Sequence, residues 1–280
     1  MSKNLIYLLG SGRSGTTLLA TILNSTMQIH TLGELHQVYS YIKEKLKCSC
    51  GERLEDCDFW KHVLSKMELT QEDLSTLSQA QNYEEQHRFI PFVFLGKNAS
   101  SDYSKSQEIL FKALASEKST WFLDSSKYIG RFLLLKQLKF LNVKGVYVIR
   151  DVRGVIHSFS KKVQTTRGPL NTILYYLLTN IFGQICAWLF KDVVKIKYED
   201  LIENPEETLH KVYALIDQRY DEIIASDFVM PHIIGGNRLK SNKSIAIKKD
   251  FAWKKNISRP KQILYYILAL PIMILNNYKV

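Results

Sequence analysis

The stretch that decides the fold is residues 5–19, which read LIYLLGSGRSGTTLL. An apolar run typical of a strand breaks into a loop of glycine, serine, arginine and threonine, and helical character follows. Glycines let a backbone approach an anion closely, and hydroxyls and amide N–H groups at a helix N-terminus bind one. The stretch therefore predicts a phosphate-binding loop. The residues that supply these groups are Gly10, Gly12, Ser14, Gly15, Thr16 and Thr17.

The loop lacks the lysine of the ATP- and GTP-binding version, G-x-x-x-x-G-K-[ST]. Gly10 and Gly15 keep the spacing of the two glycines, but Thr16 stands in place of the lysine, and the cation is Arg13 inside the loop. Such a loop suits a ligand whose 5′ end carries one phosphate joined to another small anion. A tight turn without a ligand and a degenerate NTPase loop are the alternatives.

The run G-R-S-G-T-T-L-L resembles the 5′-phosphosulfate loop of sulfotransferases that use PAPS, 3′-phosphoadenosine 5′-phosphosulfate. A second segment, RDVRGVIHS from Arg150, resembles the R-D-x-R motif of the same family. In that motif the first Arg and a Ser eight residues later hold the 3′-phosphate, which implies this role for Arg150 and Ser158. The form that includes His157 resembles the carbohydrate and tyrosylprotein branches. Without the resemblance, Arg150 and Arg153 would be ordinary surface charges.

Later segments extend the resemblance. The segment around Tyr198 is similar to one that brings a tyrosine near the adenosine, and LDSSKYIGR implies that Lys127 faces the cofactor or acceptor. HIIGGNRLKSN, from His232, resembles the loop that closes over the nucleotide, with Asn237 and with Arg238 as a second guanidinium for the 3′-phosphate. For the segment around Tyr198 the structural alternative is an ordinary helix start at Pro205. For the segment from His232 it is a Gly-Asn turn.

The resemblance implies in-line transfer through a loose transition state. Arg13 would stabilise the leaving oxygen of the product, 3′,5′-ADP. A base must take the proton of the acceptor, and the resemblance to the tyrosylprotein branch assigns Glu34 to this role, with His36 as the alternative. No metal is expected. An N-cap or exposed carboxylate is the structural interpretation of Glu34.

The composition limits the class of partner. The chain has 280 residues, a formal net charge of +11 and 46% hydrophobic residues, enough for a sizeable core. The positive charge fits a polyanionic nucleotide, an acidic glycan or an anionic membrane surface. Scattered lysines without a zinc finger, an RNP-type motif or a recognition helix argue against nucleic acid.

Strand-like runs recur at residues 5–9, 120–123, 144–149 and 193–197, each followed by helical periodicity. This alternation predicts an α/β fold, a P-loop-like parallel sheet flanked by helices, with ligand sites at the carboxyl ends of the strands. The polar residues 46–118 predict a helical cap inserted into a single domain of residues 1–280.

Three of the four cysteines, Cys48, Cys50 and Cys57, lie in KCSCGERLEDCDFW. A loop of reduced thiols, a local disulfide and a metal site are all compatible with this spacing. A fourth metal ligand is not evident, although His36 and His62 lie nearby.

Residues 169–190 carry no charge and are long enough to cross a bilayer. Spanning would separate two strands of one predicted sheet, so we expect a buried helix, or one with a membrane-contacting face. Residues 263–275 predict a closing core helix or an interfacial one. Strand character from Asn4 leaves no room for a signal sequence, so we expect a cytoplasmic protein with possible peripheral membrane contact.

Together these features predict a PAPS-dependent sulfotransferase that acts on a hydroxyl of a glycan or glycolipid. Peptide tyrosine sulfation is the alternative within the class, and a P-loop kinase or NTPase is the alternative outside it.

Overall fold

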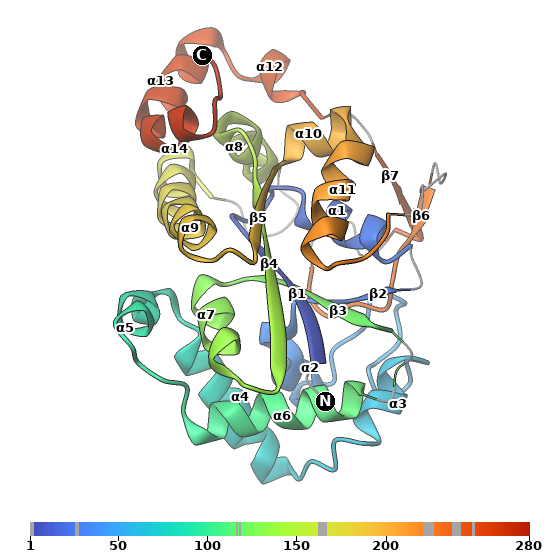
Figure 1. Ribbon diagram of the computed structural model, residues 1–280. Helices are drawn as coiled ribbons and strands as arrows, with labels where there is room; N and C mark the ends of the chain where they lie inside the picture. The colour runs from blue at the N-terminus through green and yellow to red at the C-terminus, as the bar shows by residue number, and fades with distance from the viewer. Residues whose placement is uncertain are drawn as a thin grey trace. The chain divides into compact units, whose positions relative to one another are not determined.

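The computed structural model describes residues 3–25, 28–115, 117, 119–161, 167–220, 227–236, 242–247 and 250–280. Its centre is a five-stranded parallel sheet in the order β2-β3-β1-β4-β5, flanked by helices (Figure 1). This confirms the predicted α/β class. The strands are β1 (Lys3–Leu9), β2 (Ile29–Gly33), β3 (Trp121–Lys127), β4 (Leu141–Ile149) and β5 (Val193–Lys197).

Strand β2 is the one strand of this sheet that the sequence did not predict. It is short, IHTLG, and mixes polar with apolar residues, so its periodicity is weak. It pairs in parallel with β3, with Ile29 opposite Trp121, and the register shifts between Thr31 and Gly33. Partners distant in sequence, rather than its own pattern, determine this strand.

The chain forms two compact units, Met1–Leu8 with Thr17–Gly145 and Asp227–Ile245, and Leu9–Thr16 with Val146–Ser226 and Ala246–Val280. The helical elements assigned mainly to the first unit are α1 (Thr16–Leu23), η1 (Leu35–Gln37), α2 (Val38–Lys43), α3 (Trp60–Leu64), α4 (Gln71–Glu84), η2 (His87–Phe89), α5 (Ile90–Phe94), α6 (Ser101–Leu114) and α7 (Ile129–Gln137). A two-stranded sheet consists of β6 (Asp227–Val229) and β7 (Ser244–Ala246).

Two capped helices dominate the segment 46–118. At the start of α4, Thr70 and Asp73 form a capping box, and at the start of α6 the Ser100 side chain accepts a hydrogen bond from the Tyr103 backbone N–H. The two helices lie side by side (Figure 1). The segment is therefore helical, as the sequence predicts.

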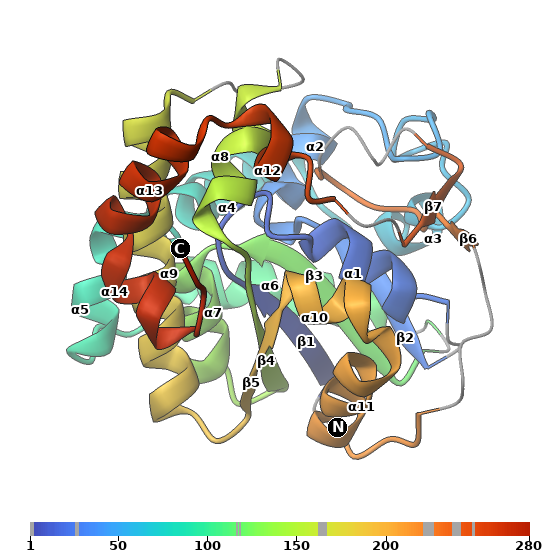
Figure 2. The same ribbon diagram turned by 90° about the horizontal axis from the view of Figure 1, so that it is seen from above.

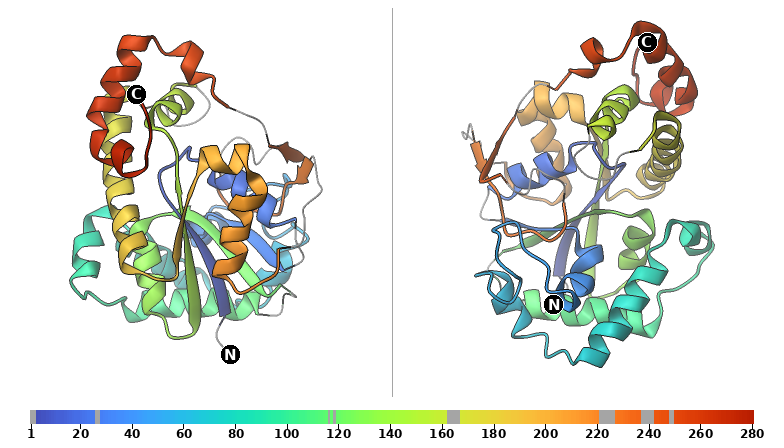
Figure 3. Two further views of the ribbon diagram at one scale, coloured as in Figure 1. Left: turned by 45° about the horizontal axis from the view of Figure 1, so that its top comes forward. Right: turned by 180° about the vertical axis from the view of Figure 1, so that it is seen from behind.

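The second unit contains α8 (Val152–Ser160), α9 (Pro169–Leu189), α10 (Tyr198–Glu203), α11 (Pro205–Leu215), α12 (Trp253–Asn256), α13 (Arg259–Leu268) and α14 (Leu270–Leu275). Helix α8 packs against α9 and α13 (Figure 2). The C-terminal helices α13 and α14 follow α12, and α14 also packs against α9 (Figure 3). Proline stands in the first turn of α9, α11, α13 and α14, where its missing N–H costs nothing.

Helix α9 buries its more polar face. The Tyr147 hydroxyl donates to Asn180 Oδ1 over 3.0 Å, and the Tyr176 hydroxyl donates to the Arg150 carbonyl oxygen over 2.9 Å. The helix is long and apolar enough to cross a membrane, yet 44% of its most apolar window is buried. It is thus neither wholly buried nor wholly exposed. Its exposed apolar residues are Leu170, Leu174, Leu178, Ile181, Trp188 and Leu189.

Candidate active site

The predicted phosphate loop belongs to the second unit and joins β1 to α1. Gly15 has a φ of +91°, and a Cβ there would lie 2.3 Å from Cδ2 of Tyr198, so only glycine fits beside this ring. The loop is tied internally by a 2.7 Å hydrogen bond between the Ser11 and Ser14 hydroxyls. Thr16 and Thr17 follow at the start of α1 and are both buried.

Arg13 lies in the middle of this loop. Its φ of +70° is unusual for a residue with a side chain, and its guanidinium carbon lies 5.5 Å from the centre of the Phe159 ring. Beside it, the Gly12 N–H donates to the Tyr175 hydroxyl over 2.8 Å. The turn therefore holds an arginine next to a backbone N–H that is hydrogen-bonded to a tyrosine hydroxyl.

Arg150, at the carboxyl end of β4, lies against the same loop. Its Nη1 donates to the Arg13 carbonyl oxygen over 3.2 Å, and its guanidinium carbon lies 4.1 Å from the centre of the Tyr198 ring. Tyr198 thus contacts both the loop glycine Gly15 and Arg150. Gly15, Arg150 and Tyr198 therefore lie together. From the sequence they are assigned to the 5′ phosphate, the 3′-phosphate and the adenosine of one nucleotide.

Arg150 also has a partner that the sequence did not predict. Its Nη2 lies 3.2 Å from Oδ2 of Asp250, and this ion pair leaves Arg150 only 5% exposed. The charge of Arg150 holds the pKa of Asp250 below its ordinary value, although burial alone would raise it. No motif marks Asp250, because it lies in a loop 100 residues along the chain.

The other charges of the R-D-x-R motif support the backbone. Asp151 caps α8 by accepting from the Arg153 N–H over 2.8 Å, and it pairs with the Arg153 guanidinium over 2.7 Å. Arg153 stacks 4.3 Å from the centre of the Trp253 ring and donates to the Lys279 carbonyl oxygen. Arg153 is therefore a buried packing residue and not a surface charge.

Two predicted cofactor-binding residues, Asn237 and Arg238, lie outside the described residues. Ser158 lies on α8 and is half-buried, two turns beyond the helix start. His157 precedes it, and its Nε2 lies 3.3 Å from Nδ2 of Asn256. The pKa of His157 is lowered by burial and by the charge of Lys161.

The predicted base Glu34 belongs to the first unit and follows β2. Gly33 has a φ of +86°, and a Cβ there would lie 2.1 Å from the carbonyl oxygen of Ile234. This close approach lets the Glu34 N–H donate to the same carbonyl oxygen over 2.7 Å. Glu34 stands at the N-cap position of η1, but its side chain makes no capping hydrogen bond.

The Glu34 carboxylate accepts hydrogen bonds from two side chains and from the backbone of Gly236. Lys127 Nζ lies 2.5 Å from Oε1, and Gln37 Nε2 donates to Oε2 over 3.0 Å. Burial alone would raise the pKa of Glu34, but the charge of Lys127 and its hydrogen bond bring it below its ordinary value. Its lowered pKa keeps Glu34 ionised near neutral pH, and its side chain is 16% exposed.

His36 differs from Glu34 in its protonation. Burial lowers its pKa to about 4, so the imidazole is neutral near pH 7. Its Nδ1 is buried without a hydrogen-bond partner, and its ring packs 4.5 Å from that of Tyr128. The pKa of Glu34 is also below its ordinary value, so basicity does not separate the two residues. Glu34 is the better candidate because its carboxylate is partly exposed, whereas Nδ1 of His36 is buried.

A buried charge network supports the ends of β2 and β3. Arg131 is fully buried between Asp124, 2.8 Å away, and Glu85, 2.5 Å away. The other oxygen of Asp124 accepts from the Leu35 and Ser126 N–H groups. These contacts hold the backbone directly after Glu34 and directly before Lys127.

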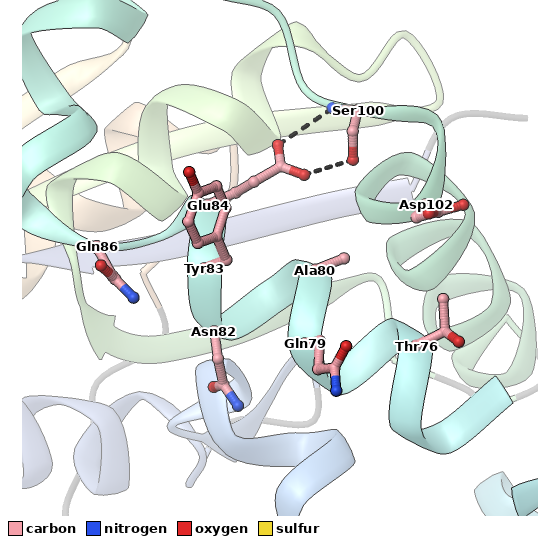
Figure 4. Close-up of a pocket in the computed structure, with 9 residues that line it drawn as sticks. All are labelled: Thr76, Gln79, Ala80, Asn82, Tyr83, Glu84, Gln86, Ser100 and Asp102. Carbon is pink, nitrogen blue, oxygen red and sulfur yellow. Dashed lines mark hydrogen bonds between the residues drawn. The ribbon is translucent and has the colours of Figure 1, made fainter. Parts of the chain in front are cut away.

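A groove in the first unit lies between α4 and the start of α6 (Figure 4). Within it, both oxygens of Glu84 accept hydrogen bonds from Ser100, one from the backbone N–H over 3.1 Å and one from the hydroxyl. The carboxylate is thereby engaged at the N-terminus of α6. None of the residues that line this groove was predicted to be functional.

Comparison with known proteins decides the family. A model described as "Sulfotransferase family" matches residues 6–222. The chain belongs to the sulfotransferase family. The family predicted from the motifs is confirmed, whereas its carbohydrate or tyrosylprotein branch stays a prediction. No curated protein sequence matches this sulfotransferase.

Two solved structures share the fold of the sulfotransferase. The sulfotransferase domain from the curacin biosynthetic pathway has a TM-score of 0.61 at 19% identity, and the comparison covers 99% of each chain. The sulfotransferase domain from the Synechococcus PCC 7002 olefin synthase has a TM-score of 0.58 at 18% identity, covering 100% of this chain and 96% of that one. At these identities the likeness shows a common fold and does not specify an acceptor.

Proposed function

We propose that this sulfotransferase moves the sulfuryl group of PAPS to a hydroxyl acceptor and releases 3′,5′-ADP. The observation that carries the proposal is the hydrogen bond from Arg150 to the Arg13 carbonyl oxygen in the second unit. It joins a glycine-rich loop that can bind a 5′ anion to a second arginine that can bind a 3′-phosphate. The loop and both guanidiniums fit a doubly anionic adenosine.

When bound, PAPS supplies the activated sulfuryl group. We assign Arg13 the role of stabilising the negative charge that develops on the bridging oxygen, because its guanidinium is positively charged and the loop N–H groups lie nearby. Arg150 and Ser158 hold the 3′-phosphate, and Tyr198 contacts the adenosine. Glu34 takes the proton of the acceptor hydroxyl. Meanwhile the acceptor oxygen bonds to sulfur and the bridging S–O bond breaks.

The test of the base is Glu34→Gln in the full chain, assayed with labelled PAPS. Glutamine keeps the shape of the side chain but cannot accept the proton, so we expect kcat to fall about 100-fold or more. The Kd for 3′,5′-ADP should stay unchanged. Glu44→Gln, an exposed glutamate of the same unit, is the matched control. A parent-like kcat in Glu34→Gln would remove Glu34 from the mechanism.

For the acceptor, we propose a glycan or glycolipid presented at a membrane. The support is the apolar face of α9, because a long row of exposed leucines beside buried polar residues reverses the usual pattern of a surface helix. α13 adds exposed Ile263, Leu264 and Ile267. The net charge of +11 favours an anionic lipid surface. The protein would then be cytoplasmic and peripheral at the membrane.

Two measurements test the acceptor and the membrane contact. Labelled PAPS is offered with oligosaccharides, glycolipids or acidic tyrosine peptides, and transfer to the peptides alone would favour tyrosine sulfation instead. Flotation with phosphatidylglycerol vesicles should recover the parent, whereas Leu174→Asp should reduce the recovery. Leu95→Asp, which changes an 85% exposed leucine of the first unit, is the control and should float like the parent.

A further inference from the structure

Three cysteines and one histidine converge in the first unit. Cys48, Cys50 and Cys57 lie between α2 and α3, and His232 comes from the segment after β6. One ligand atom from each of the four residues lies within 4.8 Å of the others, and Cys57 Sγ is 3.1 Å from His232 Nδ1. We propose that this cluster binds one zinc ion, which acts as a structural link.

The donor set is that of a closed zinc site. Three thiolates and one imidazole make a Cys3His tetrahedron, and Zn–S and Zn–N bonds of about 2.3 and 2.0 Å place such donors roughly 3.5 Å apart. Cys48 and Cys57 are buried, whereas Cys50 is exposed. The three thiols release their protons on binding, and the imidazole stays neutral. A disulfide would use only two of these sulfurs and leave His232 without a role.

Hydrogen bonds outside the cluster hold its two segments together. The Ser49 hydroxyl donates to the Pro231 carbonyl oxygen over 2.5 Å, and the Ile233 N–H donates to Ser49 Oγ over 3.0 Å. The Trp60 indole N–H donates to the carbonyl oxygen of His232 over 3.0 Å. The ligands are therefore brought together by contacts other than a metal, which is expected of a preorganised site.

The fourth ligand was absent from the sequence prediction because it lies 175 residues beyond Cys57. The two histidines considered there do not belong to the cluster. His62 is exposed on α3, and His36 packs against Tyr128. Only the fold could identify His232.

The site fixes the segment that contacts the candidate base. Two residues beyond His232, the Ile234 N–H donates to the Leu32 carbonyl oxygen over 3.0 Å, and its carbonyl oxygen accepts from the Glu34 N–H over 2.7 Å. A zinc ion at the cluster would attach this segment to the cysteine loop. We therefore regard the four ligands as positioning residues, and the inference that they bind zinc does not depend on the proposed reaction.

The test is metal analysis of the full chain, purified without an affinity tag and under reducing conditions. We expect about one zinc per chain by mass spectrometry of the elements. The zinc-depleted protein should bind Co²⁺ with the visible bands and thiolate charge-transfer absorption of a tetrahedral sulfur-rich site. It should also unfold at a lower temperature than the zinc-loaded protein and recover when zinc is restored.

Cys50→Ser is the informative variant, because an exposed side chain can be replaced without disturbing the core. We expect its zinc affinity, measured by competition with a chromogenic chelator, to fall more than about 100-fold, since outer-shell changes alone cost about 10- to 100-fold. Cys186→Ser, a buried cysteine in α9, should retain one zinc. Three outcomes would overturn the proposal. The protein could lack zinc and also fail to bind Co²⁺, it could contain a disulfide within residues 48–57, or both variants could lose zinc equally.

Discussion

Arg150 and Asp250 form an ion pair in the second unit, with Nη2 3.2 Å from Oδ2. Arg150 also donates from Nη2 to the Asp250 carbonyl oxygen over 3.2 Å. A carboxylate therefore contacts the guanidinium that we propose for the 3′-phosphate. Because both anions would use the same donors, we expect Asp250 and the nucleotide to compete for Arg150.

The first prediction concerns this competition. Asp250→Asn removes the negative charge but keeps the size of the side chain, so 3′,5′-ADP should bind about fivefold more tightly. The effect is modest because an ion pair with a partly exposed partner is worth about 1 kcal/mol. Isothermal titration calorimetry at two salt concentrations measures it. Weaker binding in Asp250→Asn would mean instead that Asp250 orients Arg150 for the nucleotide.

The second prediction separates the two arginines. Arg150→Ala should weaken 3′,5′-ADP binding by about 2 kcal/mol, the scale of one lost charge-assisted contact. Arg13→Ala should lower kcat more than it lowers affinity, because its charge is needed most as the bond breaks. Calorimetry and single-turnover kinetics provide the two readouts. Equal affinity of Arg150→Ala and the parent would exclude Arg150 from the 3′-phosphate site.

Local patterns predicted the fold where the sequence is regular. The apolar run of β1 reappears in the structure, because a buried parallel strand has a continuous apolar sequence. β5 (VVKIK) was predicted as well, although it carries two lysines and is only partly buried. β2 escaped prediction because its two polar residues weaken this signal and because its partner β3 lies far along the chain.

The candidate functional residues divide in the same way. Arg13 and Arg150 belong to motifs with fixed spacing, so the sequence could identify them. Asp250 and His232 could not be found in this way, because each meets its partner only through the fold. The uncharged length of residues 169–190 predicted the helix α9 but not which face it exposes, since neighbouring side chains such as Tyr147 determine that.

The third prediction concerns the buried network of the first unit. Arg131→Leu leaves the carboxylates of Asp124 and Glu85 buried without their cation, and removal of one partner of such a group costs about 3–5 kcal/mol. Urea unfolding measures this loss. Lys105→Met, which breaks an exposed pair with Asp73, should leave the free energy of unfolding nearly unchanged. A loss in Arg131→Leu no larger than in Lys105→Met would contradict the prediction.

The fourth prediction concerns pH and His36. Burial lowers the pKa of the folded-state imidazole from 6.5 to about 4, so between these values the unfolded chain binds a proton that the folded chain does not. Above pH 6.5 the imidazole is neutral in both states and does not lower the free energy of unfolding. As the pH falls from 6.5 toward 4, the unfolded chain is stabilised by the proton that it binds, and the free energy of unfolding decreases by at most about 3 kcal/mol.

Urea unfolding of the parent and of His36→Gln at several pH values in this window isolates the effect. Glutamine does not titrate, so the difference in free energy between the two proteins should shrink as the pH falls from 6.5 to 4. His62→Gln, which changes an exposed histidine of α3, should follow the parent at every pH. A difference between the parent and His36→Gln that stays constant across the window would show that the imidazole titrates alike in the folded and unfolded chains.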